Sequence, residues 1–575
     1  MAGPFKAVIF DLDDTLFDCT GTLVEASRRR AAEALVEAGL PLSVSEAFEL
    51  QRKLAEEKGP RFLVLDEIAD RYDLGREAIK EAYRAYNSDE VEDIRPFDDV
   101  IPTLRSLRDQ GILCLLLTSG LYRRQSIKVE KLGLEDEFDE ILINDLERGI
   151  LLGECIRYLL DKYHLKPHEV LVVGDRPQEE IRGGKESGTI TAQMLHGKFK
   201  DMLPRDEQEV PDYKINRIFQ VPTLIELANL HRPPEKLKVV ALGGGTGLPI
   251  VLEGCKPYSR HLSAIVAVTD SGRSSGRLRE ELGMLPPGDA RNCLVALSEA
   301  GHKEQQLNKL FQYRFRDGSF EGMSLGNLII AAMTDMEGDF ESGIRSVSDL
   351  LNLQGKVLPP TVEDCHVCAR LENGTVLEQE VNVRALDKPA PIEEVFLQPR
   401  QPRALDEAEK DLHAADIIVL GPGSLYTSII TNLLVPGIRD AVAESDAKVF
   451  YVCNIMTQPG QTDGFDASTH LRELAKYLGE GVLDGAVFNS VAPPDDLMKK
   501  YRNEGAELVD LDGGLDEMDV DIAAVDLLEE LESKRVLWEK QDLLRHDPDK
   551  LGDALCRLYA GMQVGRRQSA GTLSG

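Results

Sequence analysis

The stretch VVALGGGTGLP, residues 239–249, is an apolar run that breaks into four glycines and a threonine. Such a run is typical of a buried strand that ends in a loop able to bind phosphate. A second apolar run with acidic residues at its end, VIFDLDDTLFD, occupies residues 8–18. Each junction suits phosphate chemistry, and each predicts an α/β domain of its own.

The length and composition point to a soluble protein with more than one domain. At 575 residues the chain exceeds what one hydrophobic core accommodates. Its hydrophobic content is 42%, and no apolar run reaches the roughly 18–20 residues that span a bilayer. The start, MAGPFKAVIFDLDD, has carboxylates where a signal peptide would be apolar, and nine scattered cysteines fit reduced thiols. We therefore expect a cytoplasmic protein without membrane insertion.

The formal net charge of −33 makes a polyanionic partner unfavourable. Binding a nucleic-acid backbone requires many lysines and arginines to neutralise phosphates, so we expect no nucleic acid. Small phosphorylated ligands remain compatible, because glycine loops, helix N-termini and Mg²⁺ can bind a phosphate inside an acidic protein. The sequence leaves self-association into a homo-oligomer open.

The first domain is predicted over residues 1–230. Strands are expected at 5–12, 112–118 and 170–175, with about 75 residues of helical periodicity after the first. This order predicts a doubly wound α/β domain with a parallel sheet and a helical cap insert at about 18–95. The segment HRPPEKL, residues 231–237, is the expected linker.

The second domain is predicted over residues 238–560, with a flexible tail at 561–575. It has the same fold class as the first, so the sequence predicts two doubly wound Rossmann-like domains. The two domains share no motif. The expected strands are 238–243, 262–269, 416–421 and 448–454, and the expected helices are 404–415 and 466–478.

Acidic and hydroxyl side chains follow three strands of the first domain. Asp11 and Asp13 stand two apart at the end of the first strand, Thr118 ends the second, and Asp175 ends the third with Glu180 five residues on. The carboxyl ends of parallel strands meet at one crevice, so we expect these groups to lie together. One carboxylate can attack phosphorus, a second can move the proton, and the others can hold Mg²⁺.

This constellation resembles the haloacid dehalogenase superfamily, in its phosphatase branch with a helical cap, over roughly residues 1–230. The resemblance implies hydrolysis of a small phosphomonoester, with Asp11 as nucleophile, Asp13 as general acid/base and Thr118 as a phosphate anchor. It implies Mg²⁺ held by Asp11, Asp13, Asp175 and Glu180. The family expects a lysine about 25 residues before the GD motif; here Arg148 is the nearest cation, and an arginine is not an equivalent replacement.

Five further polar segments that contain glycine occur along the second domain. After GGGTG come VTDSGRSSGRLREELG (268–283), PPGDARN (286–292), GMSLGNL (322–328), GPGSLYTS (421–428) and CNIMTQPGQTDGF (453–465). Most of them follow predicted strands. Their N–H groups and hydroxyls predict a large pocket for phosphate and sugar at one sheet edge.

In this order the strings resemble the YvcK/CofD-like family, over nearly all of residues 236–560. One branch of that family contains phospholactate transferases of deazaflavin coenzyme synthesis. The other, the YvcK branch, binds UDP-sugars such as UDP-N-acetylglucosamine and is linked to cell shape, peptidoglycan synthesis and growth on gluconeogenic carbon. The loops and the resemblance together give the candidate ligand-binding residues Gly244, Gly245, Thr246, Gly247, Asp270, Asn292, Asn327, Gly421, Gly423, Ser424, Tyr426, Thr427, Tyr501 and Arg545.

Two departures from the family pattern favour a receptor over an enzyme. Ser271 follows Asp270 where the family commonly has a second acid, and Gln461 stands where it has Glu. An adjacent acid pair suits a metal, so its loss weakens the case for metal-assisted transfer. A transferase remains the alternative for the second domain, and an inactive interaction module remains the alternative for the first.

Overall fold

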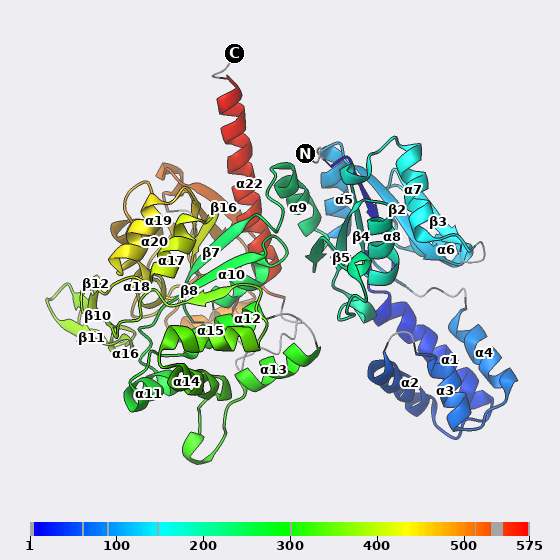
Figure 1. Ribbon diagram of the computed structural model, residues 1–575, viewed down its shortest axis with the longest axis horizontal. Helices are drawn as coiled ribbons and strands as arrows, with labels where there is room; N and C mark the ends of the chain where they lie inside the picture. The colour runs from blue at the N-terminus through cyan, green and yellow to red at the C-terminus, as the bar shows by residue number, and fades with distance from the viewer. Residues whose placement is uncertain are drawn as a thin grey trace. The chain divides into compact units, whose positions relative to one another are not determined.

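The computed structural model describes residues 5–59, 62–88, 91, 93–145, 149–245, 247–298, 302–511, 513–530 and 544–572. The chain divides into two compact units, Met1–Asn229 and Leu230–Gly575, called here the N-terminal and C-terminal units. Each contains a parallel sheet with helices packed around it (Figure 1), which confirms the predicted α/β fold class.

The sheet of the N-terminal unit has six parallel strands in the order β3-β2-β1-β4-β5-β6. In the register, Ala7 of β1 lies opposite Leu113 of β2 and Val170 of β4. Every residue of β1 is buried, as expected for a central parallel strand covered on both faces. The strands are β1 (Ala7–Phe10), β2 (Leu113–Gly120), β3 (Glu140–Asp145), β4 (Val170–Gly174), β5 (Ile190–Met194) and β6 (Tyr213–Ile215), and the helices outside the insert are α5 (Val100–Asp109), α6 (Tyr122–Lys131), α7 (Leu152–Lys162), α8 (Arg182–Glu186) and α9 (Gln220–Asn229).

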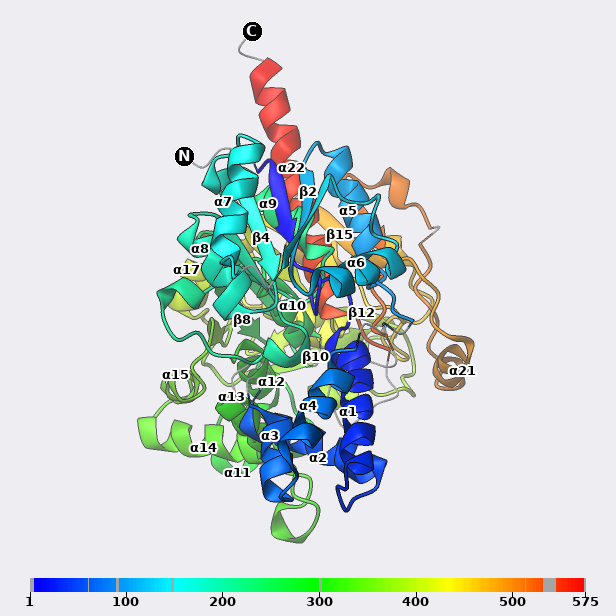
Figure 2. The same cartoon turned by 90° about the vertical axis from the view of Figure 1, so that its right-hand side faces the viewer.

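Four helices form a cap between β1 and β2, within the insert predicted from the helical periodicity. They are α1 (Glu25–Glu37), α2 (Val44–Lys58), α3 (Val64–Arg71) and α4 (Arg76–Tyr86), and they gather at one end of the N-terminal unit in both views (Figures 1 and 2). The cap has a core of its own, which includes Leu35, Leu54 and Ile68. A capping box starts α2: the Ser43 hydroxyl accepts from the Glu46 N–H, and the Glu46 carboxylate accepts from the Ser43 N–H.

The main sheet of the C-terminal unit has seven parallel strands in the order β16-β15-β14-β13-β7-β8-β9. The four predicted strands correspond to β7, β8, β13 and β14, and the two predicted helices correspond to α17 and α20. The strands are β7 (Lys238–Gly243), β8 (His261–Val266), β9 (Lys356–Leu358), β13 (Ile417–Leu420), β14 (Lys448–Val452), β15 (Gly485–Asn489) and β16 (Asp521–Val525). The helices are α10 (Leu248–Cys255), α11 (Arg273–Leu282), α12 (Gly288–Leu297), α13 (His302–Gln312), α14 (Leu325–Glu337), α15 (Phe340–Leu350), α16 (Glu380–Val383), α17 (Asp406–His413), α18 (Ile430–Leu433), α19 (Pro436–Glu444), α20 (Ala467–Leu478), α21 (Asp495–Asn503) and α22 (Pro548–Thr572).

A small antiparallel sheet, β11-β10-β12, interrupts this unit. Its strands are β10 (His366–Leu371), β11 (Val376–Glu378) and β12 (Ile392–Gln398), within the stretch 356–400 that the sequence marks as irregular and β-like. Cys365 and Cys368 are buried here, and all nine cysteines of the chain are free.

The last helix, α22, packs against α10, the first helix of the unit. A Cβ on Gly552 would lie 1.9 Å from the carbonyl oxygen of Gly254, so the two backbones touch where both residues are glycine. The Tyr258 hydroxyl, just after α10, donates to Asp553 over 3.0 Å. Helix α22 continues to Thr572, so the segment expected to be a tail is helical over 561–572; it contains no proline to stop the helix.

No helix within the described ranges is long and apolar enough to cross a membrane.

Candidate functional site

The first candidate site lies at the carboxyl ends of β2, β1 and β4, which are neighbours in the sheet. Asp11 follows the last residue of β1, Thr118 lies near the end of β2, and Asp175 follows β4. All three are buried. The structure therefore brings together the strand-end residues that the sequence assigned to one crevice.

Three carboxylates share this crevice without enough positive charge to neutralise them. Burial and the nearby Glu180 and Asp175 raise the pKa of Asp11 well above its ordinary value. Burial raises the pKa of Glu180 to about 7, and burial together with Glu180 raises that of Asp175. Among the described residues, neither carboxylate oxygen of Asp175 has a hydrogen-bond partner. Arg176 Nε lies 3.9 Å from Asp175 Oδ1.

This cluster fits a hard divalent cation. Carboxylate oxygens are the ligands that Mg²⁺ prefers, and a cation would satisfy the unpartnered oxygens of Asp175 while relieving the mutual repulsion. Asp11 and Asp175 are the residues that would hold it, since the ligand atoms of Asp11, Asp175 and Glu180 do not all lie within 4.8 Å of one another. The side chain of Asp13, expected to join them, is engaged elsewhere.

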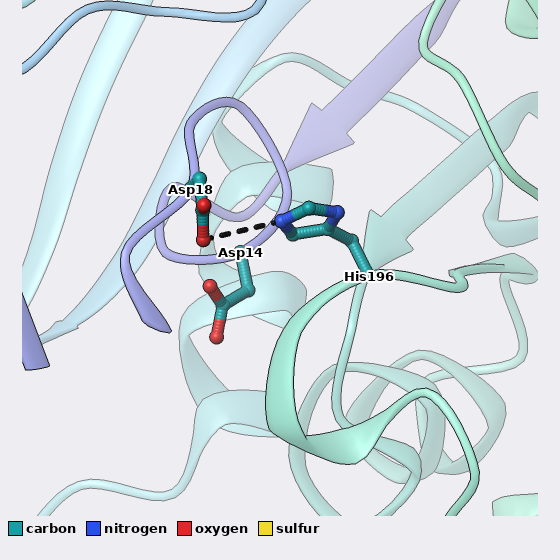
Figure 3. Close-up of side chains that lie close together, drawn as sticks. All are labelled: Asp14, Asp18 and His196. Atoms are coloured by element: carbon teal, nitrogen blue, oxygen red, sulfur yellow. Dashed lines mark ion pairs between the residues drawn. The ribbon is translucent and has the colours of Figure 1, made fainter. Parts of the chain in front are cut away.

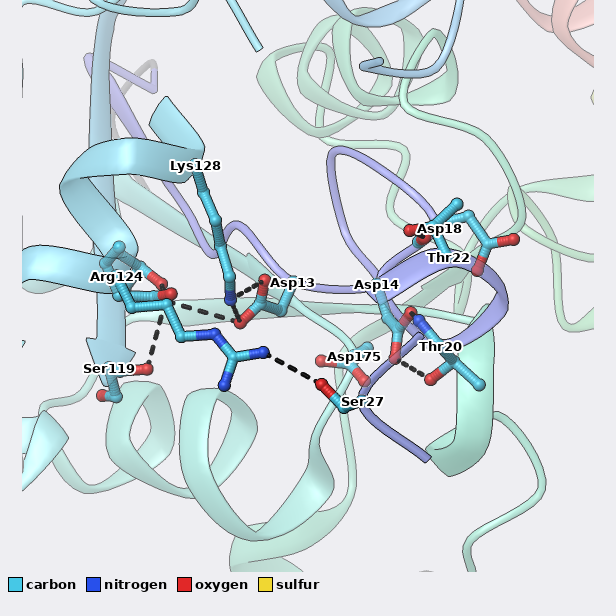
Figure 4. Close-up of polar contacts among 12 residues, drawn as sticks. Asp13, Asp14, Asp18, Thr20, Thr22, Ser27, Ser119, Arg124, Lys128 and Asp175 are labelled. Carbon is cyan, nitrogen blue, oxygen red and sulfur yellow. Dashed lines mark hydrogen bonds and ion pairs between the residues drawn. The ribbon is translucent and has the colours of Figure 1, made fainter. Parts of the chain in front are cut away.

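Both carboxylate oxygens of Asp13 accept hydrogen bonds from Lys128 of α6, at 2.8 and 2.7 Å from its Nζ (Figure 4). Burial alone would raise the pKa of Asp13, but the Lys128 ammonium outweighs it and the pKa is lowered. Gln125, one turn earlier on α6, donates from Nε2 to Thr118 Oγ1 over 2.6 Å and reaches Asp13 Oδ2 over 3.4 Å. One helix thus orders both the proposed acid/base and the phosphate anchor.

Lys128 is a lysine that the sequence analysis did not name, because that analysis looked about 25 residues before the GD motif and gave Arg148 as the nearest cation there. The lysine lies ten residues after Thr118, not in the stretch before the GD motif. Its spacing from Gln125 places both on one face of α6, which is the signal that could have revealed it. Arg148 lies outside the described residues.

A second group of ligand-type side chains, Asp14, Asp18 and His196, has its ligand atoms within 4.8 Å of one another (Figure 3). Protein partners already engage this group. Asp14 accepts from the backbone N–H and the hydroxyl of Thr20, at 2.7 and 2.5 Å, and His196 Nε2 lies 3.3 Å from Asp18 Oδ1. A Cβ on Gly197 would lie 2.3 Å from the carboxyl carbon of Asp14. The group therefore anchors the loop 195–201 against the loop that follows β1.

The second candidate site lies where β7 and β13, also neighbours, end in glycine loops. A Cβ on Gly247 would lie 2.1 Å from the carbonyl oxygen of Pro422, so the GGGTG and GPGS loops lie directly against each other. The N–H of Gly423 donates to Asn454 Oδ1 over 3.1 Å, and Asn454 Nδ2 donates back to the Gly423 carbonyl over 2.7 Å. Three of the predicted loops therefore meet here; Thr246 lies outside the described residues.

Hydroxyl and amide groups line the junction of these loops. The Thr427 hydroxyl donates to Ser424 Oγ, and Ser424 Oγ donates to Gln461 Oε1, each over 2.8 Å. The Nε2 of Gln461 is buried and has no hydrogen-bond partner within the described part of the chain. An unpaired buried donor costs about 1–3 kcal/mol, so Gln461 favours a bound acceptor at this point.

A buried arginine links two more predicted loops. Arg291 of α12 donates to Asn292 Oδ1 over 2.8 Å and to Asn327 Oδ1 over 3.0 Å. Asn292 in turn donates from Nδ2 to the carbonyl of Gly245 over 3.2 Å. The sequence pointed to the two asparagines but not to the arginine that positions both.

Acids from distant segments gather beside this network. Asp270 lies close to Asp289 of α12 and to Glu380 of α16: burial and then Asp270 raise the pKa of Asp289 to about 6 and that of Glu380 to about 7. The Asp270–Ser271 departure removes an acid from the sequence motif, but the fold supplies two others nearby. The metal argument drawn from that departure is therefore weaker than the sequence suggested.

The remaining predicted ligand residues separate into two environments. Tyr426 is 1% exposed and its hydroxyl bonds to Glu473 of α20, so it packs in the interior of the unit. Tyr501 of α21 accepts a hydrogen bond from the N–H of Leu544 over 3.0 Å, and its electrostatic influence reaches Arg545. The structure thus places Tyr501 near Arg545.

Comparison with known proteins divides the chain in the same way. Residues 239–528 match the family described as 2-phospho-L-lactate transferase CofD, and residues 5–188 match the haloacid dehalogenase-like hydrolases. The gluconeogenesis factor of Bacillus subtilis (strain 168) is 42% identical over 325 residues, which is 56% of this chain and 98% of the relative. The gluconeogenesis factor of Halalkalibacterium halodurans is 42% identical over 322 residues, covering 56% of this chain and 96% of the relative. A solved structure from Bacillus halodurans, a member of the UPF0052 family, is 41% identical with a TM-score of 0.51 and covers 56% of this chain and 99% of that one.

Proposed function

Because the chain belongs to the 2-phospho-L-lactate transferase CofD family through residues 239–528 and carries a haloacid dehalogenase-like hydrolase domain at residues 5–188, we propose that it is a bifunctional cytoplasmic protein. The N-terminal unit is a Mg²⁺-dependent phosphomonoester hydrolase. The C-terminal unit binds a UDP-sugar such as UDP-N-acetylglucosamine and regulates cell shape, peptidoglycan synthesis and gluconeogenic growth.

The observation that carries the hydrolase is the pairing of Asp11, in a crevice of buried acids, with an Asp13 ordered by Lys128. Asp11 attacks the phosphorus and forms an aspartyl phosphate while the P–O bond to the alcohol breaks. Asp13, which Lys128 keeps ionised, relays a proton from the Lys128 ammonium to the leaving oxygen. Water, deprotonated by Asp13, then releases phosphate from Asp11. Lys128 and Gln125 hold Asp13 and Thr118 in place through both steps. Mg²⁺, when bound by the acids, neutralises negative charge on the substrate phosphate.

This hydrolase is tested in the full chain with a generic aryl phosphate. We expect Mg²⁺-dependent turnover that Asp11→Asn abolishes and that Asp98→Asn, a substitution of an exposed aspartate in the same unit, leaves unchanged. Turnover that survives Asp11→Asn would come from another protein or site. No turnover in the unmodified chain would favour the inactive interaction module.

The observation that supports a receptor is the buried Nε2 of Gln461, which has no partner among the described residues, at a position where the family pattern has a carboxylate that could act as a base. An amide can donate to a phosphate or sugar oxygen but cannot take a proton from it. The grouped acids Asp270, Asp289 and Glu380 are the feature that favours the transferase instead.

Calorimetric titration with UDP-N-acetylglucosamine, followed by mass spectrometry of the same sample, separates the two. We expect binding with intact ligand, weakened by Arg545→Ala and unaffected by Arg502→Ala, whose side chain is exposed on α21 beside Tyr501. A consumed ligand would establish the transferase, and no binding would overturn the assignment to UDP-sugars.

A further inference from the structure

A large cavity lies beside the proposed hydrolase crevice in the N-terminal unit. Its volume is about 1020 Å³, and its walls come from the loop after β1, the cap helices and the loop 195–201. Thr20, which lines it, donates two hydrogen bonds to Asp14, three residues after Asp11. The cavity therefore opens next to the place where the leaving alcohol of a bound phosphomonoester would be.

The charged side chains that line the cavity are mostly paired with each other. Arg28 Nη1 lies 2.8 Å from Glu25 Oε1 on α1, and Arg52 Nη2 lies 3.8 Å from Glu56 Oε1 on α2. His196 is paired with Asp18 across the two loops. Each cap arginine in the wall thus has a carboxylate neighbour on its own helix and keeps further N–H donors.

Two lining lysines, Lys198 and Lys200, are not part of these ion pairs, and Lys198 is the one near the acids of the crevice. Burial and Arg176 lower the pKa of Lys198, while the charges of Asp14 and Asp175 oppose this change. Its Nζ also lies 4.9 Å from the centre of the Phe199 ring. Lys198 is therefore placed to meet the phosphate end of a substrate, not the alcohol.

The rest of the wall offers both donors and acceptors beside aromatic surface. Tyr83 and Tyr86 of α4 and Phe62 contribute rings, and Gln51 of α2 is buried in the wall, with its Nε2 donating to the Arg28 carbonyl over 3.0 Å. Carboxylates held by ion pairs still have lone pairs that can accept from hydroxyls. Such a wall suits a neutral group with many hydroxyls and a flat hydrophobic face.

Resting on the proposed hydrolase, we propose that the N-terminal unit acts on phosphomonoesters of bulky, polyhydroxylated alcohols. A cavity of this size is at the upper end of the roughly 300–1,000 Å³ typical of small-molecule sites, and it exceeds what a two- or three-carbon alcohol fills. The shared chemistry is a sugar ring that carries one phosphate. A free sugar phosphate and a nucleoside monophosphate both present it.

The first test compares kcat/KM of the full chain for glucose 6-phosphate, uridine 5′-monophosphate and 2-phosphoglycolate, with acetyl phosphate as the reference. We expect at least one of the two ring substrates to exceed 2-phosphoglycolate by more than about tenfold, a difference of about 1.4 kcal/mol. The two arms distinguish a sugar from a nucleoside. A preference for 2-phosphoglycolate, or equal rates for all, would overturn the inference while leaving the hydrolase intact.

A cavity-filling substitution locates the effect. Ala55 of α2 lines the cavity, so Ala55→Phe should reduce kcat/KM for the preferred ring substrate at least about tenfold while acetyl phosphate is turned over as before. The matched control is Ala38→Phe, an exposed alanine at the end of α1 that does not line the cavity. Retained acetyl phosphate turnover shows that the variant is folded. An equal loss for both substrates would contradict a role for the cavity.

A binding measurement tests the cavity independently of turnover. With Asp11→Asn as the background, calorimetry with the preferred ring phosphate should show binding that Ala55→Phe weakens. Binding without turnover in the unmodified chain would leave the cavity assigned and overturn only the hydrolase. No binding in either background would overturn the cavity.

Discussion

The ion pair between Lys128 and Asp13 allows a quantitative test, because both side chains are buried. They are 6% and 14% exposed, and Nζ lies 2.7 Å from Oδ2. Lys128→Met keeps the aliphatic stem but leaves the carboxylate with the long 3.4 Å contact from Gln125 and the hydrogen bond with the Cys19 thiol. Removing one partner of a buried pair costs about 3–5 kcal/mol. For a domain of this size that lowers the midpoint of thermal unfolding by roughly 6–20 °C.

The double variant distinguishes pairing from general damage. Asp13→Asn alone leaves a buried ammonium and should cost as much, whereas the two substitutions together remove both charges and should recover most of the loss, since neutral replacement of a buried pair is often tolerated. The control pair is Lys162 and Glu140, joined over the same 2.7 Å but 44% and 16% exposed. Lys162→Met should cost no more than about 1 kcal/mol.

Calorimetry of the full chain in EDTA measures these shifts without any contribution from bound cation. The single tryptophan, Trp538, belongs to the C-terminal half of the sequence, so tryptophan fluorescence should not follow the transition that moves. If Lys128→Met cost no more than Lys162→Met, or if the double variant lost the sum of the two singles, the pair would not organise this site.

Three further predictions concern packing and charge. Gly197→Ala should destabilise the N-terminal unit by about 1–3 kcal/mol more than Gly133→Ala. Both glycines have φ of +65°, but only a Cβ at 197 would meet a neighbour, the Asp14 carboxyl group. Equal shifts of the midpoint of thermal unfolding would contradict this. Burial and Asp270 raise the folded-state pKa of Asp289 to about 6, so its charge destabilises the C-terminal unit increasingly from about pH 4 and fully above about pH 6. Asp289→Asn should therefore raise the free energy of unfolding by up to about 3 kcal/mol at pH 8 and by little at pH 4, as measured by denaturant titration. A stabilisation independent of pH would refute this assignment. Burial lowers the pKa of His546 to about 4, so the free energy of unfolding of the C-terminal unit should fall by up to about 3 kcal/mol as pH falls from 6.5 to 4. His546→Gln should flatten this dependence of stability on pH. An unchanged pH dependence would exclude His546 as its cause.

The fold class was accessible from the sequence because parallel strands buried on both faces are continuous apolar runs with polar loops at their carboxyl ends. Strands β1, β2, β7 and β13 all have this form. Strand β6 has only three residues and β16 is largely exposed, so neither has a run long enough to separate it from a loop.

In the first site the sequence named candidates at strand ends: Asp11 and Asp175 follow strands, and Thr118 lies near the end of β2. In the second site it also named Asn292 and Asn327, which lie on helices α12 and α14. Lys128 and Arg291 act from helices, and their roles depend on partners more than thirty residues away. The pairing of His196 with Asp18, 178 residues apart, likewise has no local spacing that could reveal it.

The contact between α10 and α22 also sets an order of events during synthesis. All strands of the N-terminal unit are synthesised before β7, so that unit can fold while most of the C-terminal unit is still being translated. The C-terminal unit cannot, because its first helix packs against its last, nearly 300 residues later. Until α22 emerges, the surface of α10 that it covers stays exposed, and the nascent chain depends on chaperones or on rapid elongation for protection. Codon usage and elongation rate over residues 248–572 should therefore influence the yield of active protein far more than the same changes over residues 1–229.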